Sequence, residues 1–146
     1  MAEASNWQLV WAPRMLSILR IVTGLLFMEH GLSKIFNFPP QATPRDYALM
    51  TLVPGLAGLI EAIGGALLTV GLFTRVAAFI MSGEMAFGYF MAHAPRNFFP
   101  ILNGGDAAIL YCFVFLYFAV AGGGEWSLDR VLFRRSPGSA ATRAAA

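Results

Sequence analysis

The chain has 146 residues, of which 58% are hydrophobic and only 12% are charged, and its formal net charge is +2. A soluble domain carries about 25% charged residues, so this composition argues against an ordinary soluble fold and predicts one membrane domain. The small positive charge comes without a basic-aromatic surface motif, so we expect no nucleic-acid partner. The single cysteine, Cys112, excludes an intramolecular disulfide and a CxxC redox pair.

The apolar residues gather into four segments, each close to the ~20 residues that cross a bilayer core. We expect four transmembrane helices, over residues 15–36, 52–73, 76–94 and 106–121. Helices are favoured over strands because backbone groups in lipid must bond within their own segment, and no alternating pattern is present. The first segment contains Arg20 and is followed by FNFPP, so it is interpreted as a retained span and not as a signal peptide. The fold class is therefore all-α, a four-transmembrane-helix bundle.

Basic residues set the expected orientation. An even number of spans puts both termini and the turn between the second and third spans on one side of the membrane. That side holds Arg14, Arg75, Arg130, Arg134, Arg135 and Arg143, whereas the opposite loops hold Arg45 and Arg96, with Lys34 near the end of the first span. The positive-inside rule then predicts a multi-pass protein of the inner (plasma) membrane with both termini in the cytoplasm.

The two ends of the chain are expected to be peripheral. Residues 1–14 form a predicted N-terminal interfacial segment, residues 15–122 the transmembrane domain, and residues 123–146 a cytoplasmic amphipathic and disordered tail. Within that tail, Ser127 can cap a short interfacial helix that begins LDRVLFRR, with its apolar residues on lipid. A basic tail in solvent is the alternative.

Three ionisable residues fall deep inside the spans, where a charge costs at least ~2.5–3.5 kcal/mol. Arg20 and Glu84 come at similar depths, and we expect them to form an ion pair. Glu61 lies among small residues on its helical face, so it should point into the bundle, either protonated or paired with Arg20. We expect Arg20, Glu61 and Glu84 to form a polar intramembrane site. Whether that site binds a ligand or fastens the helices stays open.

A second polar set lies near the outer boundary, in the segment FMEHGLSKIF and its partial copy FMAH. It comprises His30, Lys34, His93, Asn103 and Asp106. His30 and Lys34 are four residues apart and share a helical face, whereas Glu29 points away from Arg20 and is left out of the site. Helix capping and snorkelling of Lys34 are the alternative explanation. The spacing matches no compact metal-ligand motif, and nothing identifies a catalytic residue.

Four ordered motifs resemble those of the DoxX family of small bacterial membrane proteins. They are RIVTGLLFMEHGLSKIF, GLIEAIGGALLTVGLFTRVAA, GEMAFGYFMAHAP and LNGGDAAILYCFVFLYFAVAGGGEWSLD. The family pattern matches Arg20, His30, Gly31, Lys34, Glu61, Gly65, Thr74, Arg75 and the ending Ser127-Leu128-Asp129, while Glu84, His93 and Asn103 match a subgroup. Asp106 stands where a glutamate is common, Glu29 where an apolar residue is usual, and Gly123 where proline is common.

The resemblance implies an accessory or membrane subunit of a quinone- or thiol-linked redox system, with a polar intramembrane pocket and redox partner proteins. The cofactor stays open, and quinone is suggested by family analogy alone. The bilayer is an expected partner, and a homo-oligomer stays open. A small proton-coupled carrier and a non-catalytic membrane scaffold are the alternatives that the buried charges leave. An enzymatic activity of the chain itself has no motif to support it.

Overall fold

The computed structural model describes residues 5–42 and 51–133, and within these ranges it contains helices and connections but no strand. In chain order the elements are α1 (Asn6–Phe36), the π-helical turn η1 (Leu52–Leu56), α2 (Ala57–Val70), α3 (Thr74–Gly88), the π-helical turn η2 (Tyr89–His93), α4 (Pro100–Asn103), α5 (Asp106–Ala121) and α6 (Leu128–Leu132). The predicted all-α class is confirmed for the described residues. The predicted tail covers residues 123–146, and its part from residue 134 onward lies outside the described residues.

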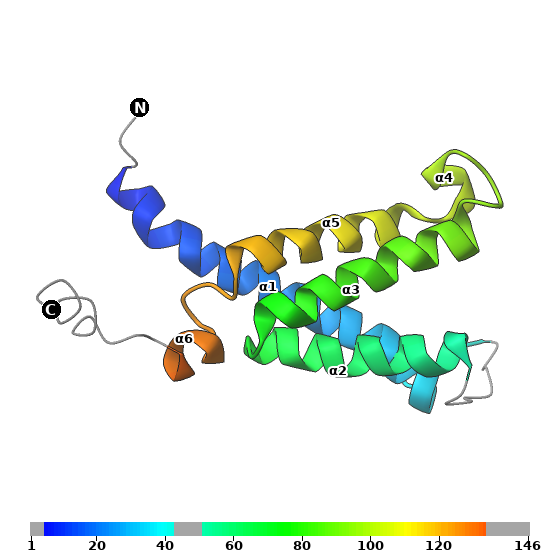
Figure 1. Cartoon of the computed structure of the whole chain (residues 1–146), viewed down its shortest axis with the longest axis horizontal. Coiled ribbons are helices and arrows are strands. Elements are labelled where there is room, and N and C mark those ends of the chain that lie inside the picture. Colours follow the sequence, from blue (N-terminus) through cyan, green and yellow to red (C-terminus); the bar gives the residue numbers. More distant parts are fainter. Residues whose placement is uncertain (1–4, 43–50, 134–146) are drawn as a thin grey trace, which may run out of the picture.

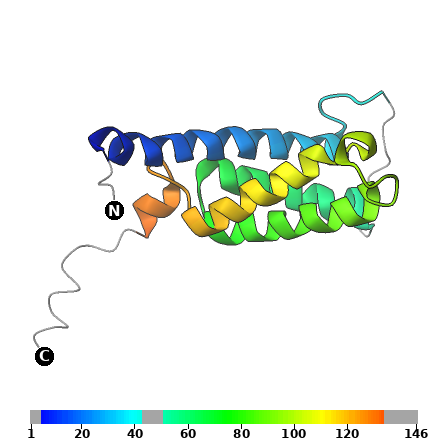
Figure 2. The same ribbon diagram turned by 90° about the horizontal axis from the view of Figure 1, so that it is seen from above.

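The four longer helices, α1, α2, α3 and α5, run side by side (Figures 1 and 2). α1 packs most extensively on α2, and α3 packs most extensively on α5. The first turns of α1, the α2–α3 turn and α6 lie at one end of the molecule, which we call the α6 end. The last turns of α1 and the short helix α4 lie at the other end, which we call the α4 end.

Local signals explain where the helices begin and end. Ser5 caps α1 because its hydroxyl accepts from the Gln8 amide at 3.4 Å, while the Gln8 side chain accepts from the Ser5 amide at 3.0 Å. The helix therefore starts at Asn6 and not at residue 15. α2 ends where Gly71 adopts φ 72°, a left-handed conformation that glycine allows. The bounds of α5, by contrast, match the predicted span over residues 106–121.

Length and composition together mark one of the described helices as able to cross a membrane. α1 has 31 residues and is sufficiently apolar, whereas α2 and α5 are apolar but shorter, with 14 and 16 residues. The π-helical turns lengthen α2 and α3. The turn η1 leads directly into α2, and the turn η2 follows α3 directly.

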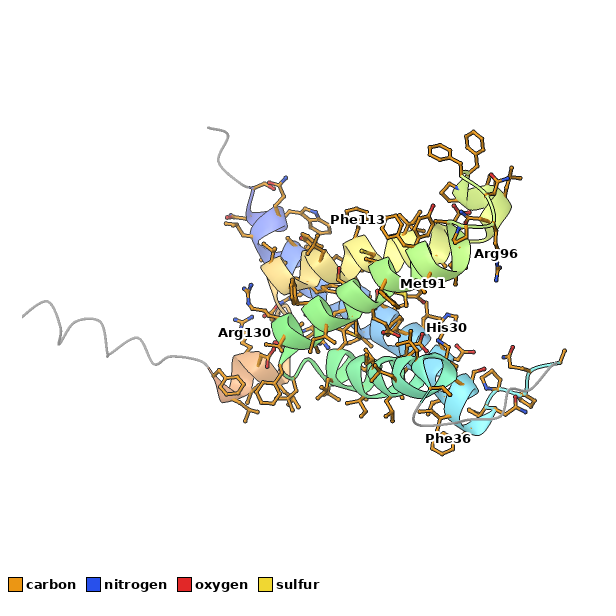
Figure 3. All side chains as sticks on the ribbon, turned by 45° about the vertical axis from the view of Figure 1, so that its right-hand side comes forward. His30, Phe36, Met91, Arg96, Phe113 and Arg130 are labelled. Carbon is orange, nitrogen blue, oxygen red and sulfur yellow. The ribbon has the colours of Figure 1, made fainter. Side chains whose placement is uncertain are left out.

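The exterior of this helical assembly is apolar, and its interior is partly polar. Large side chains such as Phe79 and Phe113 are 66% and 65% exposed, and Figure 3 shows Phe113 on the outer side of α5. The buried residues instead include Ser17, Arg20, Thr23, Glu61, Thr74, Ser82, Asn103 and Ser127, beside a small apolar core of Phe27, Leu68, Ala77, Ala78, Met81, Phe115 and Phe118. A lipid environment favours this distribution, because polar groups then face the helix interior.

Glycines let α1 and α2 approach at the level of their backbones. A Cβ atom on Gly65 of α2 would lie 2.6 Å from the Met28 amide nitrogen, and one on Gly24 of α1 would lie 2.6 Å from the Thr69 hydroxyl. Such contacts between small residues are typical of helix pairs in membranes. The same close approach buries Glu61, which confirms the prediction that its side chain points into the assembly.

Candidate functional site

Arg20 is fully buried at the α6 end, where it donates to backbone carbonyls only. Its Nε donates to the Gly123 oxygen at 2.8 Å, and its Nη2 donates to the Trp126 oxygen at 2.7 Å. Its Nη1 donates to the Thr69 oxygen at 2.7 Å and to the Leu68 oxygen. The last turn of α2 has carbonyls without helical partners, and its dipole favours a cation there. We call this set of bonds the Arg20 lock.

The predicted ion pair between Arg20 and Glu84 is wrong. Arg20 donates hydrogen bonds to four carbonyl oxygens, and both carboxylate oxygens of Glu84 are buried without a hydrogen-bond partner. Arg20 and Glu84 were paired because they lie at similar depths in their spans, but similar depth does not ensure contact. The Arg20 guanidinium is instead surrounded by four carbonyl oxygens, which belong to α2 and to the segment after α5.

Further contacts at the α6 end fasten the same segments. The Asp129 carboxylate accepts from the amides of Phe73 at 2.6 Å and Thr74 at 2.8 Å, and so caps the start of α3. Ser127 accepts from the Arg130 amide at 3.3 Å, which confirms the predicted cap of the short helix, here α6. Arg14 pairs with Glu125 at 3.1 Å. The sequence patterns had not indicated the Asp129 cap or the Arg14–Glu125 pair.

Lys34 and Glu61 form an ion pair between α1 and α2. The side chain of Glu61 is 3% exposed and that of Lys34 is 26% exposed. Glu61 therefore has Lys34 as its partner and not Arg20, and the predicted inner and outer polar sets are joined at this point. The physical reason is the length of the lysine stem: helical side chains lean toward the helix N-terminus, which here is the deeper side of the assembly.

Glu84 of α3 completes a cluster with these two residues. It is close enough to Glu61 and Lys34 to interact electrostatically with both. Neither of its oxygens has a hydrogen-bond partner, and the Glu61 Oε2 atom also has none. We call these residues the Lys34–Glu61–Glu84 cluster. It brings one ammonium and two carboxylates from three helices into a buried space.

A pocket of about 440 Å³ lies beside this cluster. It is lined by Leu26, Glu29, His30, Ser33, Lys34, Pro39, Gln41 and Tyr111, and we call it the α1 pocket. Lys34 belongs to both the pocket and the cluster. The volume falls within the ~300–1,000 Å³ that is usual for small-molecule sites.

Glu29 lines the α1 pocket, although the sequence prediction left it out of the polar sites. That prediction compared its direction with that of Arg20, which is not among the residues that line the pocket. Ser33, Pro39 and Gln41 were also missed. Ser33 lies on α1 between His30 and Lys34, but its side chain is uncharged and belongs to no recognised motif. Pro39 and Gln41 follow the end of α1. The helical repeat does not predict the position of residues in such a connection.

Tyr111 links the pocket to the aromatic core. Its ring meets that of His30 edge-on with centroids 6.1 Å apart, and stacks on Phe115 at 5.6 Å. Phe27 lies 5.2 Å from Tyr111 and 4.6 Å from Phe115. The pocket lining thus combines hydrogen-bonding groups with the Tyr111 ring, which packs on Phe27 and Phe115 outside the lining.

The remaining predicted residues lie elsewhere at the α4 end. His93 Nδ1 lies 3.0 Å from the carbonyl oxygen of Asn103. The Asn103 side chain donates to the Asn97 carbonyl at 2.8 Å and accepts from the Gly105 amide at 2.7 Å. These bonds shape the connection between η2 and α5. Asp106 is exposed at the start of α5, as its predicted place at a helix N-terminus requires.

Residues 5–42 and 51–133 contain no group of three or more His, Cys, Asp or Glu side chains that could hold a metal ion.

The α1 pocket offers nitrogen and hydroxyl donors from His30, Lys34, Ser33 and Tyr111, together with the Glu29 carboxylate. Such a set can bind a polar ring or headgroup.

Replacing Lys34 with methionine should destabilise the protein by about 3 kcal/mol, because the buried Glu61 then loses its cation. Adding Glu61→Leu to that variant should recover most of the loss. The matched control is Arg96→Met, which removes a positive charge from an exposed position at the same end. Unfolding free energies measured in detergent by circular dichroism decide the point. Equal stability of Lys34→Met and Arg96→Met would contradict the buried pair.

Comparisons with known proteins match this chain to one family and to two relatives. The family model described as DoxX matches residues 15–94. A Haemophilus influenzae protein, described as uncharacterized, is 44% identical over 128 residues, covering 86% of this chain and 96% of its own length. A Mycobacterium tuberculosis protein, described as an uncharacterized membrane protein, is 30% identical over 141 residues, covering 85% of each chain. No solved structure matches significantly. With its family model and these two relatives in agreement, the chain belongs to the DoxX family.

Proposed function

We propose that this membrane protein crosses the bacterial inner membrane four times and that its α1 pocket binds a quinone headgroup on behalf of a redox partner. The apolar exterior supports the membrane location, as does the M. tuberculosis relative described as a membrane protein. α1 has the length to span alone, and the runs η1–α2, α3–η2 and α5 lie beside it. The shorter runs can be accommodated by local thinning of the bilayer.

Charge supports a cytoplasmic α6 end. Arg14, Arg75 and Arg130 lie at that end, whereas Arg96 lies at the α4 end, as Figure 3 shows for Arg130 and Arg96. The other arginines that entered the prediction, Arg45, Arg134, Arg135 and Arg143, lie outside the described residues. An excess of basic residues marks the cytoplasmic side of a bacterial membrane protein.

Topology can be tested with single cysteines in a Cys112→Ala background. Asn97→Cys in the η2–α4 connection should react with a membrane-impermeant maleimide added to intact spheroplasts. Glu3→Cys and Ser139→Cys should react only after lysis, because both termini are predicted to be cytoplasmic. Labelling of either terminal cysteine in intact spheroplasts would contradict this orientation.

The observation that carries the quinone proposal is the composition of the α1 pocket. A quinone ring is flat and uncharged and has two carbonyl acceptors. Lys34 and the His30 ring can donate to these carbonyls, while the Tyr111 ring offers a surface for stacking. Phe27 and Phe115 pack against the Tyr111 ring and support this surface.

A bound quinone would supply the capacity to carry two electrons and two protons. The residues of this chain would bind and orient its headgroup. The chain has one cysteine and no cofactor motif, so we place the electron-transferring centre in a partner protein. The role is therefore that of an accessory or membrane subunit of a quinone-linked redox system.

Quinone binding can be measured by titrating decylubiquinone into the full chain in lipid nanodiscs. The double variant His30→Leu, Tyr111→Leu should bind at least ~10-fold more weakly, because it loses one donor and the stacking surface, each worth about 1 kcal/mol. Tyr117→Leu removes an exposed aromatic side chain from the same helix and should bind like the parent. Absence of binding, or equal binding by all three proteins, would overturn the proposal.

A proton-coupled carrier is the second candidate, because Glu61 and Glu84 are buried carboxylates within membrane-crossing helices. It ranks below the quinone site for a mechanical reason. Alternating access requires the helices to separate at each membrane face in turn. The Arg20 lock ties α1, α2 and the segment after α5 together at the α6 end.

A further inference from the structure

The Lys34–Glu61–Glu84 cluster has more acceptor oxygens than its protein donors can serve. Lys34 pairs with the Glu61 Oε1 atom. Three buried oxygens remain without a partner: Glu61 Oε2 and both oxygens of Glu84. Buried polar atoms in native proteins are almost always hydrogen-bonded, so a donor beyond those of the protein is expected at this place.

The charge count identifies what is missing. Around Glu84, α2 contributes Glu61 and α1 contributes Lys34. His30, also of α1, interacts with Glu61. α5, which packs along α3, contributes the uncharged side chain of Tyr111, which interacts with Glu61 and Glu29. With both carboxylates ionised, one ammonium faces two negative charges, and an unpaired charge in a buried space costs several kcal/mol. One proton makes the cluster neutral and supplies a donor.

We propose that Lys34, Glu61 and Glu84 form a proton-binding site that holds one proton between the two carboxylates and exchanges it with the α1 pocket. In this arrangement Glu61 stays paired with Lys34, and Glu84 carries the hydrogen. A carboxylic acid is a hydrogen-bond donor, so the protonated form also provides a donor among the unpartnered acceptors. Two interacting carboxylates titrate as a unit, so a change at either residue alters the protonation of the other.

Lys34 connects the proton site to the α1 pocket. Its side chain is 26% exposed and lines the pocket, whereas Glu61 behind it is 3% exposed. A proton can therefore reach the carboxylates from the pocket side when the lysine stem moves. The proton site follows from residues of α1, α2 and α3 and needs no quinone in the pocket, so its test is independent of the proposed function.

Infrared spectroscopy of the full chain in lipid nanodiscs, without quinone, tests this inference. At pH 7 the parent should show the C=O stretching band of one protonated carboxyl group, and the band should shift when the buffer is exchanged for D₂O. Glu84→Gln should lose the band. Glu61→Gln should lose it as well, because Glu84 then becomes the counter-ion of Lys34. Glu29→Gln, a carboxylate of the pocket wall, is the matched control and should keep the band.

Lys34→Met should roughly double the band, because removal of the only ammonium leaves both carboxylates to be neutralised by protons. The inference is overturned if the parent shows no protonated carboxyl band at pH 7, or if Glu61→Gln leaves the band unchanged. A band that does not shift in D₂O would refute exchange with the pocket. A metal cation in place of the proton would give a different pair of results. The band would be absent, and Na⁺, but not choline, would raise the melting temperature of the parent but not that of Glu84→Gln or Glu61→Gln. The proton assignment would then be wrong.

Discussion

The guanidinium of Arg20 donates to carbonyl oxygens of two chain segments that are far apart in sequence, and the arrangement of the other helices depends on these bonds. Thr69 and Leu68 end α2, while Gly123 and Trp126 follow α5. The Leu68 oxygen also accepts from the Gly71 amide at 3.1 Å, whereas Arg20 supplies the donor for the oxygens of Thr69, Gly123 and Trp126. A buried acceptor that loses its donor costs about 1–3 kcal/mol. A single side chain of α1 thus satisfies the end of one helix and fixes the exit of another.

The two ends of the helical assembly solve the problem of buried charge in different ways. At the α6 end, Arg20 is surrounded by neutral carbonyls, and Asp129 caps the start of α3. Arg20 and Asp129 are thus hydrogen-bonded to several backbone groups, which suits a structural role. At the α4 end, Lys34 and Glu61 form an ion pair, but three carboxylate oxygens keep free acceptor capacity beside a pocket. Incomplete satisfaction is what a site needs if it is to bind protons or ligands.

The sequence predicted the helices better than the polar contacts. Hydrophobic length and the glycines after it placed α5 correctly, and the Ser127 cap located α6. The start of α1 was missed, because a capping box at Ser5 extends the helix beyond its apolar part. The crossing of the membrane itself, with the number of spans and the direction of the termini, stays a prediction.

The errors in the site have a common physical cause. Counting residues gives the depth and the direction of a Cα atom, but Arg20 and Lys34 carry their charges several ångströms away on flexible stems. Arg20 therefore reached the carbonyls after α5, and Lys34 reached Glu61. The comparison of helical directions also left Glu29 out of the predicted polar sites. Glu29 nevertheless lines the α1 pocket together with several other residues of α1.

The most direct measurement of the central claim is the unfolding free energy of Arg20→Met with and without Glu84→Leu, in detergent, compared with Arg75→Met. Arg75 is exposed and also donates to carbonyls of α5, so it is a matched control. We expect Arg20→Met to lose at least ~3 kcal/mol, because several buried carbonyls lose their donor, and Arg75→Met to lose much less. Glu84→Leu should not restore the loss. Recovery of stability in the double variant would show that Arg20 balances Glu84, and would contradict the carbonyl lock.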